Sequence, residues 1–328
     1  MIWLIAAAAL LPAGHVEAGS PRIHVHATPV SLNAADAGQQ QLGRLRFLGG
    51  VALRSSDPHF GGLSALRWYR GRLLAMSDEG AAFYAMQPRE RHGRLIGMGA
   101  VSRTFLRGPD GKVLTGKQET DTESMEVNLL HGRRGDASIS FGFERHDRIW
   151  TYRLREGLPV GKPVPMTTAP GWFARQPDNL GVEAMAGNRQ VSLLISEGLK
   201  TLDGQASALL FRPGIAGRVH PADPVEIGIP APGARRPSEL AMIDPHHFLM
   251  LRRSWSEAEG FQVELDALDL NADRASIHRL AEFKPPIVTD NFEGMAVRKE
   301  GGRVVLYIIA DDNFEKKQRT LLLKFRLD

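Results

Sequence analysis

The sequence lacks cysteine in all of its 328 residues. A disulfide framework, a thiolate metal site and a cysteine nucleophile are therefore excluded, as is a lipoprotein anchor, which requires a cysteine. The chain also lacks a long basic run, because its 41 Lys and Arg residues are scattered and the net charge is only +4. We therefore expect no nucleic-acid partner, whereas a small anionic substrate suits this mild positive charge.

Long hydrophobic runs are also missing, except at the N-terminus. Residues 1–12 are almost wholly apolar, which is short for a bilayer span but suits the core of a signal peptide. Val16-Glu17-Ala18 before Gly19 has the pattern of a cleavage site, although no Lys or Arg precedes the apolar run, so a membrane anchor is the alternative. We expect a signal peptide over residues 1–18 and an N-terminal extension over 19–40. The mature protein should be periplasmic or secreted, with no stable membrane insertion.

Helical periodicity is weak after residue 40, and the long helices that a parallel sheet needs are not seen. In their place, one short pattern recurs five times: a polar residue followed by a small apolar step into a strand. The intervals between the polar residues are 59, 60, 56 and 54. A period of this size indicates an array of similar units. The five polar residues are Ser64, Glu123, Glu183, Glu239 and Glu293.

Each unit divides into four short strand-like runs, separated by Gly, Pro and Asp at the turns. The last unit is one strand short, and Gly43–Leu53 has no partner within its own part of the chain. As the outer strand of the last unit, this segment would close a ring and leave no open sheet edge. The sequence therefore predicts an all-β propeller over residues 41–328 with five four-stranded blades. Six blades would follow if Ile23–Leu32 formed a further sheet.

The first strand of a propeller blade lines the central channel, so the five polar residues should converge at one end of it. Carboxylates at close range repel one another and need a compensating positive charge. Oxygen ligands without His or Cys favour Ca²⁺ over Zn²⁺ or Cu²⁺. The predicted calcium ligands are Ser64, Glu123, Glu183, Glu239 and Glu293. In the alternative interpretation, each Glu only bonds to backbone groups at the start of its strand.

The second strand of each blade should end on the same face, beside the start of the first strand. Four of these five ends carry an acid, and nearby loops carry Arg and Lys. A metal that polarises phosphoryl oxygens, with Arg side chains holding the anion, suits a phosphate ester. The candidate catalytic residues are Asp78, Arg252, Asp311, Asp312 and Arg319. Strand capping and local ion pairing are the alternative roles for them, and no Gly-x-Ser-x-Gly motif or Gly-rich phosphate loop occurs.

Several segments also carry a family likeness: Gly61–Leu66, Ala75–Asp78, Asp290–Ala296, Asp311–Phe314 and Gln318–Leu322. Together they resemble the phytase-like domain of secreted bacterial proteins, a family described by the esterase-like activity of phytase. The resemblance covers roughly residues 45–327, and Asp290–Met295 is its most specific part. It implies a β-propeller and the hydrolysis of esters.

A second similarity concerns the ring alone. Calcium-activated apyrases are five-bladed propellers whose central Ca²⁺ is ringed by Ser and Glu at the starts of inner strands, and the five polar residues here are similar in kind and placement. The sequence therefore favours a monomeric, exported, calcium-dependent hydrolase of phosphate or related esters. The alternative is a non-catalytic periplasmic binding propeller in which Ca²⁺ only fastens the blades together.

Overall fold

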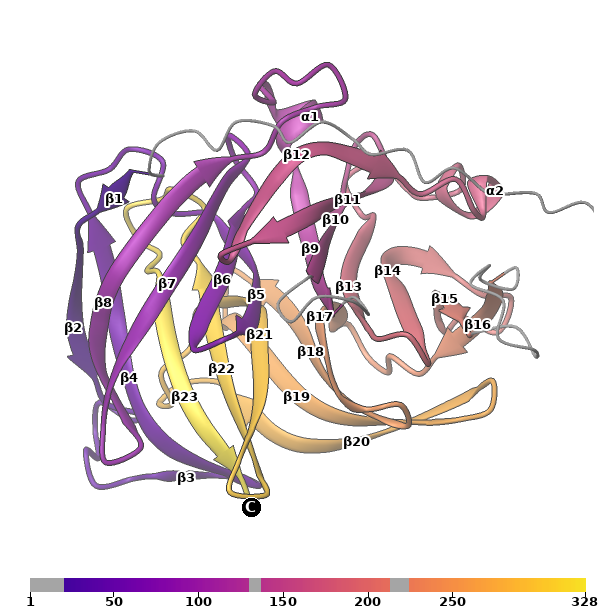
Figure 1. The fold of residues 1–328 in the computed structure, drawn as a ribbon. Coiled ribbons are helices and arrows are strands. Elements are labelled where there is room, and N and C mark those ends of the chain that lie inside the picture. Colours follow the sequence, from indigo (N-terminus) through magenta and orange to yellow (C-terminus); the bar gives the residue numbers. More distant parts are fainter. Residues whose placement is uncertain (1–20, 130–136, 213–223) are drawn as a thin grey trace, which may run out of the picture.

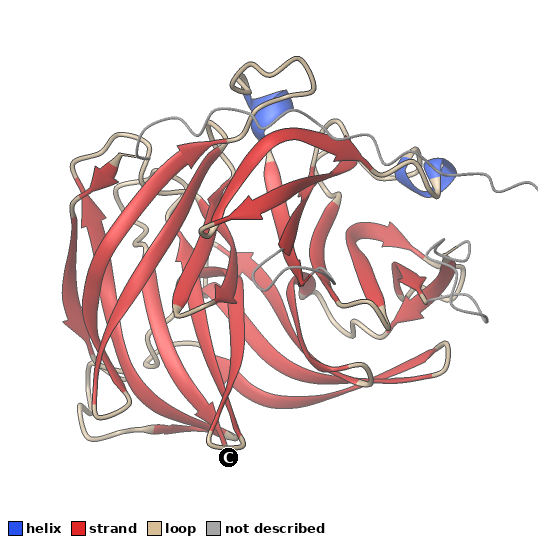
Figure 2. Ribbon diagram, viewed as in Figure 1, coloured by secondary structure: helices blue, strands red, loops and turns tan. Residues whose placement is uncertain are grey.

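The computed structural model describes residues 21–129, 137–212 and 224–328. Over these residues the chain folds into five antiparallel sheets, arranged as a propeller with four strands in each blade (Figure 1). The two short helices, α1 (Lys117–Thr120) and α2 (Pro170–Phe173), lie at the same end of the molecule (Figure 2). The predicted fold class and blade number are confirmed. The predicted signal peptide lies outside the described residues.

Four blades follow the chain directly, each from one inner strand outward. Blade 1 contains β5 (Leu63–Tyr69), β6 (Arg72–Ser77), β7 (Ala82–Arg91) and β8 (Arg94–Phe105). Blade 2 contains β9 (Thr122–Leu129), β10 (Ala137–Phe143), β11 (Arg148–Arg155) and β12 (Leu158–Pro165). Blade 3 contains β13 (Val182–Gly187), β14 (Ser192–Lys200), β15 (Ala206–Phe211) and β16 (Val225–Ile229). Blade 4 contains β17 (Arg236–Asp244), β18 (His247–Ser256), β19 (Gly260–Asn271) and β20 (Arg274–Phe283).

Blade 5 closes the ring by combining both ends of the described chain. It contains β21 (Asn291–Glu300), β22 (Arg303–Asp311) and β23 (Leu321–Leu327), and its outer strand is β4 (Leu45–Ser55), as the sequence predicted. Three shorter strands flank this closure: β2 (Val25–Val30) and β3 (Gln41–Leu42) pair with β4, and β1 (Arg22–Ile23) pairs with β8. These strands extend blades 5 and 1, so the alternative of a sixth blade is wrong.

Two-residue turns with left-handed backbone set several of the hairpins. In the turn from β5 to β6, Arg70 has a φ of 49° and Gly71 a φ of 81°. Two successive positive φ values define the type I′ turn, whose twist matches that of the strands that it joins. Glycine adopts such a conformation without a steric penalty. This is why glycine marked the strand ends in the sequence.

The hydrophobic core lies in layers between neighbouring blades. Between blades 5 and 1, for example, Leu66 and Leu73 pack with Ile309 and other residues of the last sheet. The layer between blades 2 and 3 is the thinnest among the described residues, and it includes Trp172 of α2. The indole Nε1 of Trp172 donates to Ser207 Oγ at 2.8 Å.

All five inner strands begin at the face where α1 and α2 lie, along the upper edge of the molecule in Figure 1. The turns that follow the second strands lie on this face too, because first and second strands are antiparallel. We call it the upper face. In the described part of the chain, no helix has both the length and the apolar character to cross a membrane.

Candidate functional site

A one-residue β-bulge near the start of each inner strand builds the centre of the upper face. At the bulge, pairing with the second strand skips one residue, and such a residue is re-aimed relative to a regular strand. The skipped residues are structurally equivalent, at intervals of 59, 60, 55 and 55. They form the inner ring: Ser64, Glu123, Glu183, Ser238 and Glu293.

The inner ring differs from the predicted one in blade 4. The bulge of β17 falls at Ser238, and Glu239 pairs in register with Leu251. Because side chains alternate along a strand, a shift of one residue changes the direction in which a side chain points. Glu239 therefore bonds to Arg67, deeper in the channel, and Ser238 takes its expected place. The corrected ring has three glutamates and two serines.

A second set of equivalent residues, the outer ring, ends the second strands. The backbone N–H groups of Asp78, Glu144 and Glu197 each donate to the residue just before the inner strand, over 2.8 to 2.9 Å. Arg253 and Asp311 take the matching places in blades 4 and 5. The outer ring thus contains four carboxyl groups and one guanidinium.

The carboxyl groups of the two rings raise one another's pKa values. Burial raises the pKa of Asp78 to about 6, although Lys117 opposes this shift. Burial also raises the pKa of Glu144 to about 7. The pKa values of Glu123 and Glu183 lie well above their usual range, because neighbouring carboxylates add to the effect of burial. A cation placed here would be stabilised by all of these groups.

Side chains of the protein neutralise one part of this negative charge. The Nζ of Lys117 lies 2.6 Å from Asp78 Oδ2 and 2.7 Å from Asp121 Oδ1. On the other side of Asp121, Arg145 Nε lies 2.5 Å from Oδ2. Oxygens of Asp78, Asp121 and Glu123 come within 4.8 Å of one another, as in a metal site. Here, however, the Lys117 ammonium already acts as the cation.

The guanidinium of Arg253 neutralises a second part of the negative charge of the two rings. Its Nη2 lies 2.7 Å from Glu293 Oε1, which also accepts from Asn291 Nδ2 at 3.0 Å. Asp311 belongs to this side of the upper face, since burial and the nearby carboxylates of Glu293 and Asp78 hold its pKa well above the usual range.

A third acidic group lies between blades 2 and 3, and among the described residues its ion pair is longer than those made by Lys117 and Arg253. Oxygens of Glu144, Glu183 and Glu197 lie within 4.8 Å of one another, and these residues are only 3%, 4% and 9% exposed. Arg236 lies 3.8 Å from Glu197, and the charge of Arg253 also lowers the pKa values of Glu183 and Glu197. Since Ca²⁺–oxygen bonds are about 2.3–2.6 Å long, one ion can contact oxygens with this spacing. We call Glu144, Glu183 and Glu197 the glutamate triad; its donors fit a hard divalent cation.

Arg67 of β5 occupies the axis below the inner ring. Its guanidinium donates to the carbonyl oxygens of the residues two positions after the bulge in four blades, which are Leu66, Met185, Leu240 and Met295. Four equivalent acceptors around one group place that group on the axis of the propeller. The channel at this level is therefore filled by a side chain of the protein.

Two carboxylates balance the charge of Arg67. Glu239 binds both terminal nitrogens, at 2.8 and 3.1 Å, and Glu126 Oε2 lies 3.3 Å from Nε. Burial alone would lower the pKa of Arg67, but the two carboxylates raise it above its usual value. With Glu126 from β9, the guanidinium contacts all five inner strands.

Other residues predicted for the site have structural contacts. The Ser64 hydroxyl donates to the Thr122 carbonyl at 2.6 Å and so joins β5 to β9. Asp312 accepts from the Gly62 N–H at 2.9 Å and from Thr320 Oγ1 at 2.7 Å, which fixes the turn after β22.

The two predicted arginines differ in their surroundings. Arg252 is buried in blade 4, where its Nε donates to Asp266 at 2.6 Å and its Nη2 to Glu264 at 2.5 Å. Its Nη1 also donates to the Pro232 carbonyl at 2.9 Å. Arg319 is half exposed, with its Nε 3.6 Å from Asp290 Oδ2, and remains accessible to a ligand.

Sequence reasoning did not assign Arg67, Lys117 or Arg253, although each sits at an informative place. Arg67 is a charged residue inside an apolar inner strand, three positions after Ser64, and Glu126 is three positions after Glu123. A matched pair of opposite charges at equivalent points of two repeats is a usable signal for an ion pair within the channel. Arg253 was the exception in an otherwise acidic set of strand ends.

The fold and the upper face define a five-bladed propeller with a deeply acidic centre. A family model described as "Phytase-like: Esterase-like activity of phytase" matches residues 58–314, and the chain belongs to this family. No curated protein matches the chain.

Solved structures resemble the chain only remotely. The arabinofuranosidase PaAbf62A from Podospora anserina has 8% identity and a TM-score of 0.46, with 84% of this chain and 94% of that chain covered. The allergen Mala s 1 from Malassezia sympodialis has 12% identity and a TM-score of 0.42, with coverages of 86% and 87%. The arabinofuranosidase CtGH43 from Clostridium thermocellum has 12% identity and a TM-score of 0.39, with coverages of 82% and 90%. These likenesses carry no argument about activity.

Proposed function

We propose that the protein is an exported, monomeric, Ca²⁺-dependent hydrolase of phosphate or related esters. Membership of a family described by the esterase-like activity of phytase supports the hydrolase class. The single observation that carries the metal assignment is the glutamate triad, whose three buried carboxyl groups have no ion pair shorter than 3.8 Å among the described residues. Oxygen donors without His or Cys favour Ca²⁺ there.

In this proposal the triad holds the metal ion, and the residues around it bind the substrate. When bound, Ca²⁺ supplies a Lewis acid that polarises an ester oxygen. Arg253, Lys117 and Arg319 place positive charge around the same face and can receive the oxygens of an anionic substrate. Asp78 is suited to proton transfer, because its Oδ1 is buried without a hydrogen-bond partner in the described residues and its pKa is about 6.

Phosphate release tests the proposal. Purified protein is incubated with nucleotides, phytate and aryl phosphates, with added Ca²⁺ or with a chelator. We expect turnover of at least one substrate, lost on chelation and restored by Ca²⁺. Glu183→Gln should lose most of this activity, whereas the matched change at an exposed loop residue, Glu259→Gln, should not. Absence of turnover on every substrate at every metal supply would contradict the proposal.

A non-catalytic binding propeller with a structural Ca²⁺ is the second candidate. One observation favours it: Arg252 and Asp312, expected to act on a substrate, are engaged in internal contacts. In this case Glu183→Gln should lower the melting temperature in Ca²⁺ and leave ligand binding intact. Equal melting temperatures with and without Ca²⁺ would remove the structural role.

Export is proposed from the apolar N-terminal segment, which lies outside the described residues. Expression of the full chain followed by mass determination of the exported protein tests it. The expected mature N-terminus is Gly19. An uncleaved chain retained in the membrane fraction would favour the anchor instead.

A further inference from the structure

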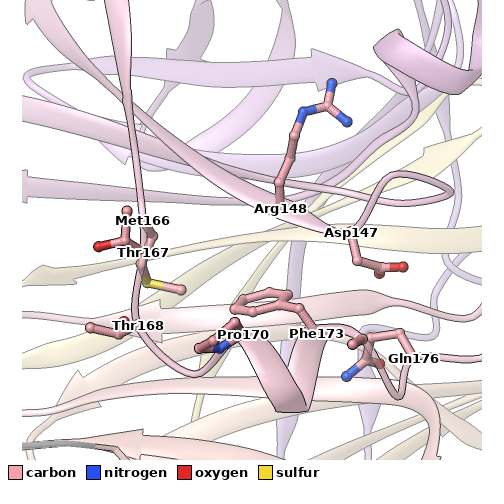
Figure 3. A pocket seen from close by; sticks show the side chains of 9 residues that line it. Asp147, Arg148, Met166, Thr167, Thr168, Pro170, Phe173 and Gln176 are labelled. Atoms are coloured by element: carbon pink, nitrogen blue, oxygen red, sulfur yellow. The ribbon is translucent and has the colours of Figure 1, made fainter.

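A pocket of about 490 Å³ opens on the upper face, at the junction of blades 2 and 3. The turn after β10 forms one side of it, and the connection from β12 through α2 forms the other (Figure 3). The residues that line it are Asp147, Arg148, Met166, Thr167, Thr168, Pro170, Phe173, Ala174 and Gln176. None of them belongs to the inner or outer ring.

One side of the pocket is apolar. Figure 3 shows the Phe173 ring and the Met166 thioether facing the same space, with Pro170 below them. An aromatic face and a polarisable sulfur attract both apolar groups and organic cations. A ligand with a hydrocarbon body therefore fits this side.

The opposite side carries the carboxyl group of Asp147, one oxygen of which has no hydrogen-bond partner among the described residues. Asp147 Oδ1 is buried and has no hydrogen bond among the described residues, and the same holds for Thr168 Oγ1. Burial raises the pKa of Asp147 to about 6, so the group is ionised above neutral pH. A carboxylate that keeps one backbone hydrogen bond but has an unpaired oxygen gains from a charged donor.

The neighbouring arginine does not serve as that donor. The guanidinium of Arg148 lies 4.1 Å from the ring centre of Phe143 and 4.4 Å from that of Trp150, and it donates to Glu119 at 3.1 Å. Figure 3 shows it extended away from Asp147. The Arg148 charge lowers the pKa of Asp147, but no hydrogen bond joins the two side chains in the described part of the structure.

The pocket adjoins the glutamate triad through Gly181. The N–H of Gly181 donates to Glu144 Oε1 at 2.7 Å, while a Cβ on Gly181 would lie 2.4 Å from Asp147 Oδ1. The lack of a Cβ at Gly181 therefore leaves no side chain of that residue between the Asp147 carboxylate and the triad.

We propose that this pocket binds a small organic ammonium ion, with its charged group on Asp147 and its apolar body against Phe173 and Met166. A neutral ligand of the same shape would leave the carboxylate without a charged donor. The assignment does not depend on hydrolysis, since it rests on the pocket alone.

Calorimetry with 2-phenylethylammonium tests the proposal, with 2-phenylethanol as the neutral analogue, at about pH 8 where Asp147 is ionised. We expect the ammonium ion to bind, and the alcohol to bind at least about tenfold more weakly. Asp147→Asn, which keeps the shape of the side chain, should weaken binding of the ammonium ion by at least about tenfold. It should leave the affinity for the alcohol unchanged. Phe173→Ala should weaken the binding of both ligands.

Two controls accompany these variants. Glu259→Gln, an exposed change in blade 4, should leave ammonium binding within about threefold of the wild type. The melting temperature of Asp147→Asn verifies that the variant is folded. Failure of the ammonium ion to bind, equal binding of the alcohol, or full affinity in Asp147→Asn would each overturn the assignment, whatever the result of the phosphate-release assay.

Discussion

Arg67 and Glu239 form a two-point ion pair on the axis of the propeller, with nitrogen–oxygen distances of 2.8 and 3.1 Å. They come from blades 1 and 4, which are 172 residues apart in the chain. The guanidinium supplies the positive charge that the repeated acidic residues require at this level of the channel. At this level of the channel the guanidinium takes the place that a metal ion on the axis would need.

Loss of this central cation should destabilise the fold. Arg67→Met removes the charge but keeps much of the side-chain volume, and it leaves Glu239 and Glu126 buried without a counter-charge. Removing one partner from a buried ion pair costs about 3–5 kcal/mol, and we expect a loss in this range in the free energy of unfolding, measured by urea titration.

A double variant provides the control. Arg67→Met with Glu239→Met removes both partners, and replacing both with apolar groups is far less costly than removing one. The double variant should therefore recover much of the loss. A single variant within about 1 kcal/mol of the wild type would show that the pair does not fasten the blades.

The sequence predicted the blades and the closure well, because both depend on local signals. The turn Arg70-Gly71 has the residue types that a two-residue hairpin needs, and it joins β5 to β6. Gly43–Leu53 was assigned to the last blade because an open edge would otherwise remain, and β4 occupies that place. The expected convergence of strand starts and strand ends on one face is also present.

The centre of the site was less predictable, because it depends on single-residue register and on contacts between blades. Ser238 and Glu239 are both polar, so the repeat interval alone does not tell which of them lies at the bulge. Similarly, Arg252 and Arg253 are neighbours in sequence, yet only Arg253 reaches the acidic rings. These assignments require the pairing of specific strands, and no periodicity in the sequence contains that information.

The glutamate triad should give opposite stability effects with and without calcium. In a chelator, Glu183→Gln removes one of several repelling buried carboxyl groups, so we expect its melting temperature to equal or exceed that of the wild type. In Ca²⁺ the order should reverse, because a ligand at about 100 times its Kd stabilises the folded wild type by about 2.7 kcal/mol. Glu259→Gln is the matched control and should respond to Ca²⁺ as the wild type does. An equal calcium shift in Glu183→Gln would count against the triad as the site.

Glu90 should give the fold part of its acid sensitivity. It receives hydrogen bonds from Tyr307, from Lys324 Nζ at 2.9 Å and from Arg298 Nη2 at 3.1 Å, which join blade 1 to blade 5. Burial opposes ionisation, but these partners outweigh it and lower the pKa of Glu90 below its ordinary value of 4.5. The ionised form is thus favoured by folding.

The contribution of Glu90 to stability is therefore complete above about pH 4.5 and is lost as the pH falls through its lower folded-state pKa. Urea titrations at a series of pH values should show a steeper fall in unfolding free energy below that point for the wild type than for Glu90→Gln. Parallel curves for the two proteins would exclude Glu90 as the group responsible.

Substitutions of the adjacent residues Arg252 and Arg253 should have different effects, the first on stability and the second on calcium affinity. Arg252→Met leaves Glu264 and Asp266 without their buried partner, so we expect a loss of about 3–5 kcal/mol in unfolding free energy, with calcium affinity unchanged in the folded protein.

Arg253 lowers the pKa of both Glu183 and Glu197, and it therefore competes electrostatically with a cation at the triad. Arg253→Met should tighten calcium binding by about tenfold, measured by calorimetric titration. If Arg253→Met instead weakened calcium binding, the guanidinium would be holding the triad in place for the metal, and the off-axis site would need its charge.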